Sequence, residues 1–490
     1  MMLQIKSEAA ESATLALPPA VPLAVDMDGT LLAGDTLHEA LVTLLLKRPL
    51  ALLRALPSLR HGRAAFKRQV ALAAPEVALA VPPRPAVLAW LHEQRDAGRA
   101  LHLVTAADQS VADAVADQLG IFDSATGSDG TLNLGGEAKA RWLAARFPQG
   151  FAYAGNSAAD LAVFAVAREI ALVAVPRRIQ AQAHALGRPV LREIAGPVGG
   201  LRAWVQALRP HQWSKNLLML VPLILGHRLT DADALVPVLL GVVAMSLAAS
   251  GTYLLNDLAD LAADRLHASK RHRALAAGRV PPLPALLLAA ALMLLPIGAA
   301  LLLAPWFGAG LAGYVLLSLA YSARLKRVPL LDTLTIAGLF MTRLGLGVLL
   351  AQVPWSAWLM SFAGFFFFSL ALAKRHGEVM QARGLPATAL THRGYRAEDW
   401  PLTLGFGLSA GVAALQIMIL FVANDAWPSR LYHTPAWLYA TPPLVAVWLT
   451  RLWLLAHRQQ LHDDPVIFAL RDPQSWASGA LVALAIGLAL

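Results

Sequence analysis

Two long stretches without a charged residue constrain the fold of this chain more than any other feature. Residues 234–255 and 280–323 contain no Asp, Glu, Lys or Arg. At about 1.5 Å per helical residue the second stretch spans about 66 Å, enough to cross a hydrocarbon core of about 30 Å twice. The AVILMFWYC residues make up 57% of the chain and charged residues only 15%, whereas about 25% charged residues are typical of soluble domains. Much of the chain must therefore face lipid.

Extending this pattern along the carboxyl-terminal part predicts an all-α membrane bundle of nine transmembrane helices. Residues 304–308 form the predicted turn inside the longer uncharged stretch. The nine predicted spans are residues 212–227, 234–255, 282–304, 307–324, 328–351, 355–373, 402–424, 434–454 and 474–490.

The basic residues of the loops alternate between the two sides of such a bundle. Fifteen Lys and Arg residues fall in even-numbered loops and two, Arg228 and Arg430, in odd-numbered loops. Because basic residues are enriched in cytoplasmic loops, this alternation predicts a cytoplasmic amino-terminal domain and a carboxyl terminus on the opposite side of the membrane. We expect that membrane to be a bacterial inner membrane. The fifteen are Arg265, Lys270, Arg271, Arg273, Arg279, Arg324, Lys326, Arg327, Lys374, Arg375, Arg383, Arg393, Arg396, Arg458 and Arg471.

The overall charge also limits the classes of partner. Lys and Arg total 41 against 31 Asp and Glu, a net charge of +10. In a membrane protein such an excess indicates cytoplasmic loops or a phosphate-rich ligand, and without a basic soluble domain we expect no nucleic-acid partner. The chain has no Cys, which excludes disulfides and all Cys-based chemistry. The oligomeric state is not indicated.

The amino-terminal part has the pattern of a soluble α/β domain. We expect residues 1–20 to form a disordered leader without an export signal, residues 21–200 a soluble domain, and residues 201–490 the membrane domain. Short apolar runs at residues 22–25, 101–104 and 150–154 alternate with helical, charged stretches, which is typical of parallel strands and their connecting helices.

Polar side chains follow these runs where a parallel strand ends, the position at which open α/β sheets bind ligands. Asp26 and Asp28 follow the first run, so that one carboxylate can attack a phosphoryl group while the other exchanges a proton. Thr105 offers a hydroxyl to phosphoryl oxygens, and Lys139 offers a cation for their developing charge. Asp160 in GNSAAD, together with Asp26, offers oxygen ligands to Mg²⁺.

Over residues 21–195 this set resembles the haloacid dehalogenase superfamily of Mg²⁺-dependent phosphotransferases. The resemblance implies a Rossmann-like fold with a helical cap at about residues 35–95. It makes Asp26 the nucleophile, Asp28 the acid/base, Thr105 and Lys139 phosphoryl-binding residues, and Asp26, Asp28 and Asp160 metal-binding residues. The basic residues of the cap are Arg54, Arg60, Arg63, Lys67 and Arg68.

One position departs from that pattern. Asn156 stands where the superfamily usually has a carboxylate, which lowers the negative charge available to a metal. The alternative to an active phosphatase is a degenerate domain that keeps the fold for regulation or scaffolding.

The densest acidic cluster of the membrane part follows the second predicted span. In a continuous helix Asp257, Asp260 and Asp264 would lie at i, i+3 and i+7, on one face. With Asn256 they offer hard oxygen ligands, which suit Mg²⁺ shared with a substrate diphosphate. The cations after them, Lys270, Arg271 and Arg273, suit the diphosphate itself. The alternative is a solvated loop with the ordinary cytoplasmic basic residues.

Further polar clusters follow the fourth and sixth spans. Tyr321 and Lys326 precede Asp332, and Arg343 lies about three helical turns beyond Asp332, on the same side. An arginine within a span normally faces a bundle interior and marks function, although structural pairing of Asp332 with Arg343 is the alternative. Lys374-Arg375-His376 with Glu378 could equally be a basic membrane anchor, and Tyr321 and Glu378 could be catalytic or position loops.

Residues 200–490 combine nine predicted spans with the motifs NDxxDxxxD and YSxxLK. Together these features resemble the UbiA superfamily of intramembrane prenyltransferases, whose members bind a diphosphate through Mg²⁺ at two acidic motifs. Asp332 would be the first Asp of the second motif, DxxxD. Ile336, four residues later, stands where the second Asp is expected, so one carboxylate is missing. The segments 209–216, 256–278, 321–332, 371–378 and 463–472 instead resemble the decaprenyl-phosphate phosphoribosyltransferase branch, with HASK and RALA in place of expected prolines.

The resemblance implies a membrane transferase with a polyprenyl lipid and a diphosphate co-substrate as partners, and Mg²⁺ in both domains. Two reactions remain open: transfer of 5-phosphoribose from phosphoribosyl diphosphate to a polyprenyl phosphate, or transfer of a prenyl group from its diphosphate to an aromatic acceptor. For the first, the fused phosphatase could remove the 5-phosphate. Extra phosphates would need extra cations, which Lys215, Lys326, Arg343, Lys374 and Arg375 would supply. A transporter with a regulatory domain is the third alternative, but its charges would lie near the bilayer midplane.

Overall fold

The computed structural model describes residues 21–196, 199–267, 269–383, 394–428, 432–461 and 464–490. The predicted leader at residues 1–20, and the basic loop residues Arg393 and Arg430, lie outside the described residues. The chain divides into two compact units. Unit 1 comprises Met1–Trp204 together with Asp257–Leu286, and unit 2 comprises Val205–Asn256 together with Leu287–Leu490. A segment expected in the membrane domain, 257–286, therefore packs with the amino-terminal domain.

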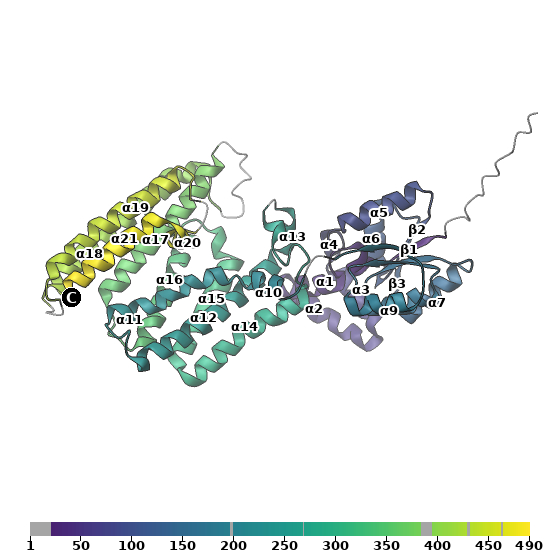
Figure 1. Ribbon diagram of the computed structural model, residues 1–490, viewed down its shortest axis with the longest axis horizontal. Helices are drawn as coiled ribbons and strands as arrows, with labels where there is room; N and C mark the ends of the chain where they lie inside the picture. Colours follow the sequence, from purple (N-terminus) through teal and green to yellow (C-terminus); the bar gives the residue numbers. More distant parts are fainter. Residues whose placement is uncertain (1–20, 197–198, 268, 384–393, 429–431, 462–463) are drawn as a thin grey trace, which may run out of the picture. The chain divides into compact units, whose positions relative to one another are not determined.

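Unit 1 contains a six-stranded parallel sheet in the order β3-β2-β1-β4-β5-β6. Figure 1 labels the strands β1, β2 and β3 of this sheet. The central strand β1 pairs with β2 on one side and with β4 on the other, with Leu23 opposite both Leu101 and Ala152. The strand order reverses between β1 and β4, where open sheets form a crevice at their carboxyl ends. The strands are β1 (Leu23–Val25), β2 (Leu101–Asp108), β3 (Ser124–Ser128), β4 (Ala152–Gly155), β5 (Glu169–Val173) and β6 (Val190–Ile194).

Helices connect these strands, and the predicted cap is helical. Between β1 and β2 the chain forms η1 (Met27–Leu31), α1 (Thr36–Lys47), α2 (Pro49–Ala55), η2 (Leu56–His61), α3 (Arg63–Ala73), α4 (Glu76–Ala80) and α5 (Pro85–Asp96). Later connections are α6 (Gln109–Leu119), α7 (Glu137–Arg146), η3 (Ala158–Asp160), α8 (Leu161–Val166) and α9 (Arg177–Ala185).

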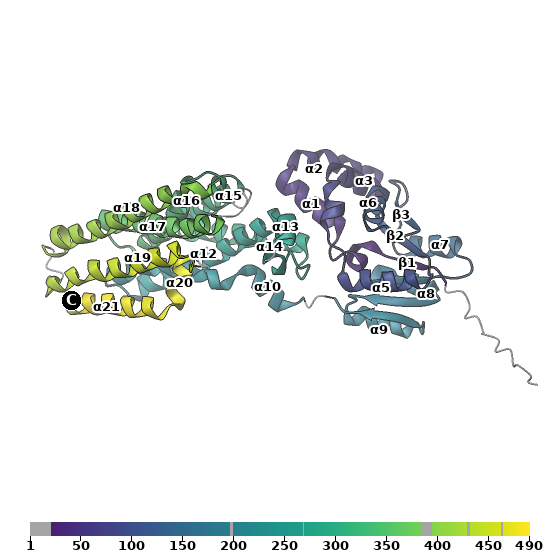
Figure 2. The same ribbon diagram turned by 90° about the horizontal axis from the view of Figure 1, so that it is seen from above.

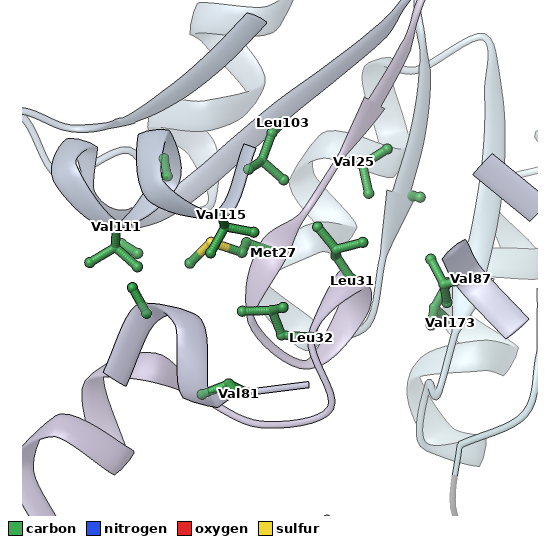
Figure 3. Close-up of a cluster of buried hydrophobic side chains, with 14 of the residues drawn as sticks. Val25, Met27, Leu31, Leu32, Val81, Val87, Leu103, Val111, Val115 and Val173 are labelled. Atoms are coloured by element: carbon green, nitrogen blue, oxygen red, sulfur yellow. The ribbon is translucent and has the colours of Figure 1, made fainter. Parts of the chain in front are cut away.

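Apolar side chains of β1 and β2 continue into the cap to form one core (Figure 3). Val25 and Leu103 from the strands, and Met27 and Leu31 from η1, are fully buried in it. Val81, which follows α4, is 2% exposed. Because the residues flanking Asp26 and Asp28 are buried, this core fixes the loop that carries both carboxylates.

Unit 2 is helical, and its long helices run alongside one another (Figure 2). Seven helices of the described residues are long and apolar enough to cross a membrane: α12 (Ala232–Ala259), α14 (Pro282–Leu303), α15 (Pro305–Ala323), α16 (Leu331–Ala351), α17 (Ala357–Ala382), Ala397–Ala426 with α18 (Trp400–Phe421), and Pro435–His457 with α19 (Thr441–His457). The chain is thus a multi-pass membrane protein, as predicted.

The prediction of nine spans is not confirmed. The first predicted span is divided into a 3-10 helix, η4 (Pro210–Leu220), and the short α11 (Val221–Leu225). Pro222 stands in the first turn of α11 and has no N–H for a helix continuing from η4. The last predicted span is α21 (Pro473–Ala489), which with 17 residues is shorter than the seven.

Candidate active sites

Asp26 and Asp28 lie on the loop that leaves the central strand. The Asp26 N–H still donates to the Ala154 carbonyl of β4, at 2.9 Å, so the ladder holds Asp26 at the strand end. Gly29 follows with a φ of +75°, and a Cβ there would meet the Asn156 side chain at 2.1 Å. Glycine therefore permits both the turn and the close approach of the β1 and β4 loops.

Burial changes the acidity of both carboxyl groups. Lys139 Nζ donates to Asp26 Oδ1 at 2.6 Å, and the Thr30 hydroxyl donates to Oδ2 at 3.2 Å. Burial nevertheless raises the pKa of Asp26 to about 6, against the lowering effect of Lys139. Burial, helped by the nearby Asp35, raises the pKa of Asp28 to about 7. One carboxyl group thus ionises more readily than its neighbour, which suits a nucleophile beside a proton donor.

Asp160 accepts hydrogen bonds at both of its oxygens. Its Oδ2 accepts from the backbone N–H groups of Asn156 and Ser157 and from the Ser157 hydroxyl, at 2.8 to 3.1 Å. Its Oδ1 accepts from the Tyr153 hydroxyl at 2.6 Å, and that hydroxyl accepts from Lys139 at 3.0 Å. These contacts favour Asp160 as the residue that holds the β4 loop and orients Lys139, rather than one whose oxygens face a ligand.

Tyr153 was not among the residues predicted from sequence. It is fully buried in β4, and burial raises the pKa of its hydroxyl well above the usual value. The only signal was a polar ring inside the apolar run 150–154. Tyr153 links Lys139 to Asp160, and the three residues lie in different secondary-structure elements. The hydrophobic periodicity of a single element cannot predict such a contact.

The other predicted phosphoryl-binding residue, Thr105, is 1% exposed in β2, where its hydroxyl accepts from the Ala107 N–H at 3.1 Å. The cap residue Lys67 reaches the same edge of the sheet and donates to the Ala106 carbonyl at 2.7 Å and to Asn133 Oδ1 at 2.9 Å. Burial lowers the pKa of Lys67, and the nearby Asp28 opposes this effect.

The acidic segment of unit 1 departs from the continuous helix that its spacing suggested. Helix α12 ends at Ala259, and Asp260 caps the separate α13 (Leu261–Leu266) with a φ of −96° and ψ of 6°. The three aspartates therefore do not share one uninterrupted helical face. Asp257 and Asp264 still converge, because Arg273 Nη1 lies 3.1 Å from an oxygen of Asp257 and 2.6 Å from an oxygen of Asp264.

The donor atoms of both sites suit a hard cation, although their arrangement is not that of a complete metal cluster. Asp26 with Asp28, and the acidic segment with Asn256, supply the carboxylate and amide oxygens that Mg²⁺ prefers. Within the described residues no three His, Asp or Glu side chains gather closely enough to hold a metal ion. In the acidic segment the guanidinium of Arg273 provides the positive charge between Asp257 and Asp264.

Asp332 in unit 2 pairs with Arg375 and not with Arg343. It lies at the start of α16, is completely buried, and has its Oδ2 2.8 Å from Arg375 Nη2. The Tyr395 hydroxyl donates to its Oδ1 at 2.7 Å. Arg375 also contacts Glu378. The Arg375 guanidinium is not aligned with Asp332 Oδ2, and that oxygen and Arg375 Nε have no hydrogen-bond partner in the described part of the chain.

Arg343 has other partners within the bundle. Its Nε donates to Asn216 Oδ1 at 2.8 Å, and its two Nη groups donate to the Leu339 carbonyl at 2.7 Å and the Tyr314 hydroxyl at 2.6 Å. The alternative of a structural pair between Arg343 and Asp332 is therefore not what the structure shows. Because these partners are neutral oxygens, they do not compensate the positive charge of Arg343. Arg343 therefore contributes a positive potential to the bundle interior.

Two predicted phosphate-binding lysines meet at a carboxylate that the sequence analysis did not select. Lys215 Nζ lies 3.0 Å, and Lys374 Nζ 3.9 Å, from Asp464 Oδ2. Asp464 also accepts from the Val466 N–H and caps α20 (Pro465–Arg471). The remaining predicted residues are Lys270 in η5 (Lys270–His272), Tyr321 in α15 and Lys326 in η6 (Leu325–Arg327).

Two family models match the chain. The model for the UbiA prenyltransferase family matches residues 219–477, more than half of the chain. The chain belongs to the UbiA prenyltransferase family. The model for haloacid dehalogenase-like hydrolases matches residues 23–165, which include the loop with Asp26 and Asp28 and the β4 loop with Asp160. This UbiA family member therefore joins a transferase-type membrane domain to a hydrolase-like domain, as the resemblances implied.

Three relatives of this UbiA family member cover different shares of it. "Uncharacterized protein y4nM" of Sinorhizobium fredii is 46% identical over 96% of this chain and 91% of the relative. "Nodulation protein NoeC" of Azorhizobium caulinodans is 33% identical over 58% of this chain and 92% of the relative. "Decaprenyl-phosphate phosphoribosyltransferase" of Mycolicibacterium smegmatis is 38% identical over 38% of this chain and 61% of the relative.

Proposed function

We propose that the membrane domain transfers 5-phosphoribose from phosphoribosyl diphosphate to a polyprenyl phosphate, and that the fused domain then removes the 5-phosphate. The C1–O bond to the diphosphate breaks, a phosphate oxygen of the lipid bonds to C1, and inorganic diphosphate leaves. Water then hydrolyses the 5-phosphate ester to give a lipid-linked ribose and inorganic phosphate.

The observation that carries this proposal is the buried environment of Asp332 and its pairing with Arg375. A family member that binds a prenyl diphosphate through two acidic motifs needs carboxylates for metal at both. Here Asp332 is fully buried against Arg375 and Tyr395, and Ile336 replaces the next carboxylate of the motif. The Arg375 side chain is 1% exposed, whereas that of Arg273 beside Asp257 and Asp264 is 31% exposed, so Arg375 has less freedom to leave its carboxylate for a metal ion. This favours a single acidic motif and cationic recognition of phosphates over the aromatic prenyltransferase alternative.

The cations of unit 2 support substrates richer in phosphate than a prenyl diphosphate. Lys215 and Lys374 share one carboxylate, that of Asp464, so this cluster has one positive charge in excess. Arg343 adds a further positive charge, since in the described part of the chain its hydrogen-bond partners are the neutral oxygens of Asn216, Leu339 and Tyr314. Phosphoribosyl diphosphate and a polyprenyl phosphate together bring a sugar phosphate and a lipid phosphate in addition to the diphosphate, which such cations suit. The phosphoribosyltransferase relative supports the same substrates.

In the transfer step the acidic segment and its cations act on the leaving diphosphate. Asp257, Asp260, Asp264 and Asn256 would hold Mg²⁺, which when bound would supply positive charge for the leaving diphosphate. Arg273, already beside two of these carboxylates, would turn its donors to the diphosphate.

In the hydrolytic step Asp26 would attack the phosphorus atom and Asp28 would donate a proton to the leaving ribose oxygen, and afterwards accept one from water. Lys139, held by Tyr153, would neutralise the phosphoryl oxygens. Mg²⁺ at Asp26 and Asp28 would supply a second positive charge there.

The test uses full-length protein purified in detergent, with Mg²⁺, radiolabelled polyprenyl phosphate and phosphoribosyl diphosphate, followed by mass analysis of the lipid. We expect polyprenyl-phosphoryl-ribose from the unmutated protein, no sugar transfer with Asp257→Asn, and accumulation of the 5-phosphate form with Asp26→Asn. A parallel reaction with a prenyl diphosphate and a ring acceptor tests the alternative. Ring prenylation without sugar transfer would refute the proposal.

We also propose the predicted topology: nine crossings of a bacterial inner membrane, with residues 21–200 in the cytoplasm and the carboxyl terminus outside. The fifteen-to-two distribution of basic loop residues supports it. Because the chain has no Cys, single cysteines introduced at residues 270 and 490 can be labelled with an impermeant maleimide in intact cells. Labelling at residue 490 alone is expected.

A further inference from the structure

We propose that the ion pair between Glu39 and Arg265 fixes the acidic segment 257–286 on the cap of the hydrolase-like domain, and so makes the fused domain a structural requirement for transfer. Arg265 is then a positioning residue of the transferase. The consequence for transfer rests on the proposed function, whereas the attachment itself does not.

The ion pair is buried and bidentate. Arg265 Nη2 lies 2.7 Å from Glu39 Oε1 and Arg265 Nη1 lies 2.7 Å from Oε2, with 7% and 4% of the two side chains exposed. Arg265 Nη1 also donates to the Ala80 carbonyl at the end of α4, at 3.0 Å. Both partners belong to unit 1. A bidentate contact of this kind fixes the relative orientation of the two side chains as well as the distance between them.

A second contact lies elsewhere on the same segment. Gly278 has a φ of +67°, and a Cβ there would lie 2.9 Å from the Ala33 carbonyl oxygen and 3.5 Å from the Ala33 Cβ. Ala33 immediately precedes the cap, whereas Glu39 lies within its first helix. The acidic segment therefore touches the cap region at two points thirteen residues apart on the segment, at Arg265 and Gly278.

The same contacts connect the two sets of aspartates through adjacent residues. At one end of α1 the Thr36 N–H donates to Asp28 Oδ1 at 2.8 Å, and one turn later Glu39 binds Arg265. Arg265 follows Asp264, which is bound to Arg273 together with Asp257. A loss of the Glu39 carboxylate charge thus frees the residue next to Asp264, and leaves a buried guanidinium without its counter-charge.

The first test measures attachment without any catalytic readout. Amide hydrogen exchange of peptides from residues 257–286 of the full-length protein, followed by mass analysis, reports how often this segment detaches from the cap. Glu39→Gln should raise the exchange rate in this segment about tenfold, the size of a typical coupling between contacting residues.

The matched control is Glu76→Gln. Glu76 also lies in the cap and pairs with an arginine, Arg48, but that pair is about half exposed and stays within the cap. It should leave hydrogen exchange in residues 257–286 unchanged. An equal exchange rate with Glu39→Gln and with the control would overturn the attachment.

The second test measures transfer. Glu39→Gln and Arg265→Gln should each raise the Mg²⁺ concentration for half-maximal transfer about tenfold, and the double variant should be no worse than either, because the two residues act through one contact. Additive losses would contradict this. If Arg265→Gln does not fold, Arg265→Lys, which keeps the charge but not the fork, should give a smaller shift.

The two proposals can fail separately. Hydrogen exchange in residues 257–286 that depends on Glu39, in a protein that transfers no phosphoribose, supports the attachment and refutes the proposed substrate. Normal transfer with an exchange rate that does not change in Glu39→Gln does the reverse.

Discussion

Replacing Lys139 by Met should abolish phosphatase activity at neutral pH, because it removes the cation at the phosphoryl oxygens and also protonates Asp26. Lys139 Nζ lies 2.6 Å from Asp26 Oδ1, with 4% and 11% of the side chains exposed. At an effective dielectric constant of about 20, two unit charges at this distance attract by about 6 kcal/mol, equivalent to about 4 to 5 pKa units. Relaxation and water entry will recover part of this, so we expect the pKa of Asp26 to rise from about 6 by at least about 2 units.

The assay is hydrolysis of p-nitrophenyl phosphate by the full-length variant between pH 5 and pH 9. A pKa near 8 leaves about a tenth of Asp26 ionised at pH 7, and loss of the cation at the phosphoryl oxygens costs a further factor of about 10² to 10³. The rate should therefore be about 10³-fold or more below that of the unmutated protein at pH 7, and this ratio should shrink about tenfold by pH 9, where Asp26 is ionised in both proteins.

The control for this prediction is Tyr153→Phe, which removes the hydroxyl 3.0 Å from Lys139 but keeps the cation. It should lower the rate less than about tenfold, as expected for one neutral hydrogen bond. Because an unpaired buried carboxylate also destabilises the fold by about 3 kcal/mol, thermal unfolding is measured alongside, with Asp26→Asn added to restore stability. A loss of rate in Lys139→Met that does not change with pH would refute the electrostatic argument.

Three further predictions concern other parts of the chain. Phosphatase activity should show a bell-shaped pH profile with apparent pKa values of about 6 and about 7, since Asp26 must be ionised to attack and Asp28 protonated to donate; a flat profile from pH 5 to pH 9 would contradict this. Arg375→Met should destabilise the protein by about 3 to 5 kcal/mol, measured by thermal unfolding, and Asp332→Asn should recover most of the loss, because the pair is buried; additive losses would count against it. Gly347→Ala should lower the unfolding temperature by several degrees, since its Cβ would meet a backbone oxygen of η4 at 2.4 Å, whereas Gly338→Ala, with open space around it, should not.

Local sequence patterns predicted the elements that depend on short-range properties. Apolar runs that end in Asp26 and Gly155 gave the strands and the edge at which the carboxylates lie, and charge-free stretches gave the long helices. Both signals arise from burial along a single segment, so they need no partner to be recognised.

Contacts between distant segments could not be predicted in the same way. Arg375 binds Asp332 from a different helix, and Tyr395 reaches that carboxylate from a third segment. Spacing along one helix left Arg343 open as an alternative partner of Asp332, but neutral oxygens of neighbouring helices satisfy Arg343 instead. The helix break at Asp260 could not be predicted either, because the spacing of the aspartates fits one helical face whether or not the helix continues through Asp260.

The packing of residues 257–286 with the amino-terminal domain has a consequence for biosynthesis. Translation releases the six-stranded domain before α12, so the cap surface that receives Arg265 can be complete when the acidic segment emerges. The segment then needs no helices beyond α14 to find its place, and an amino-terminal truncation at residue 200 would produce it without that surface. Ribosome-bound chains of increasing length should acquire protease resistance in this segment before the later helices have been synthesised.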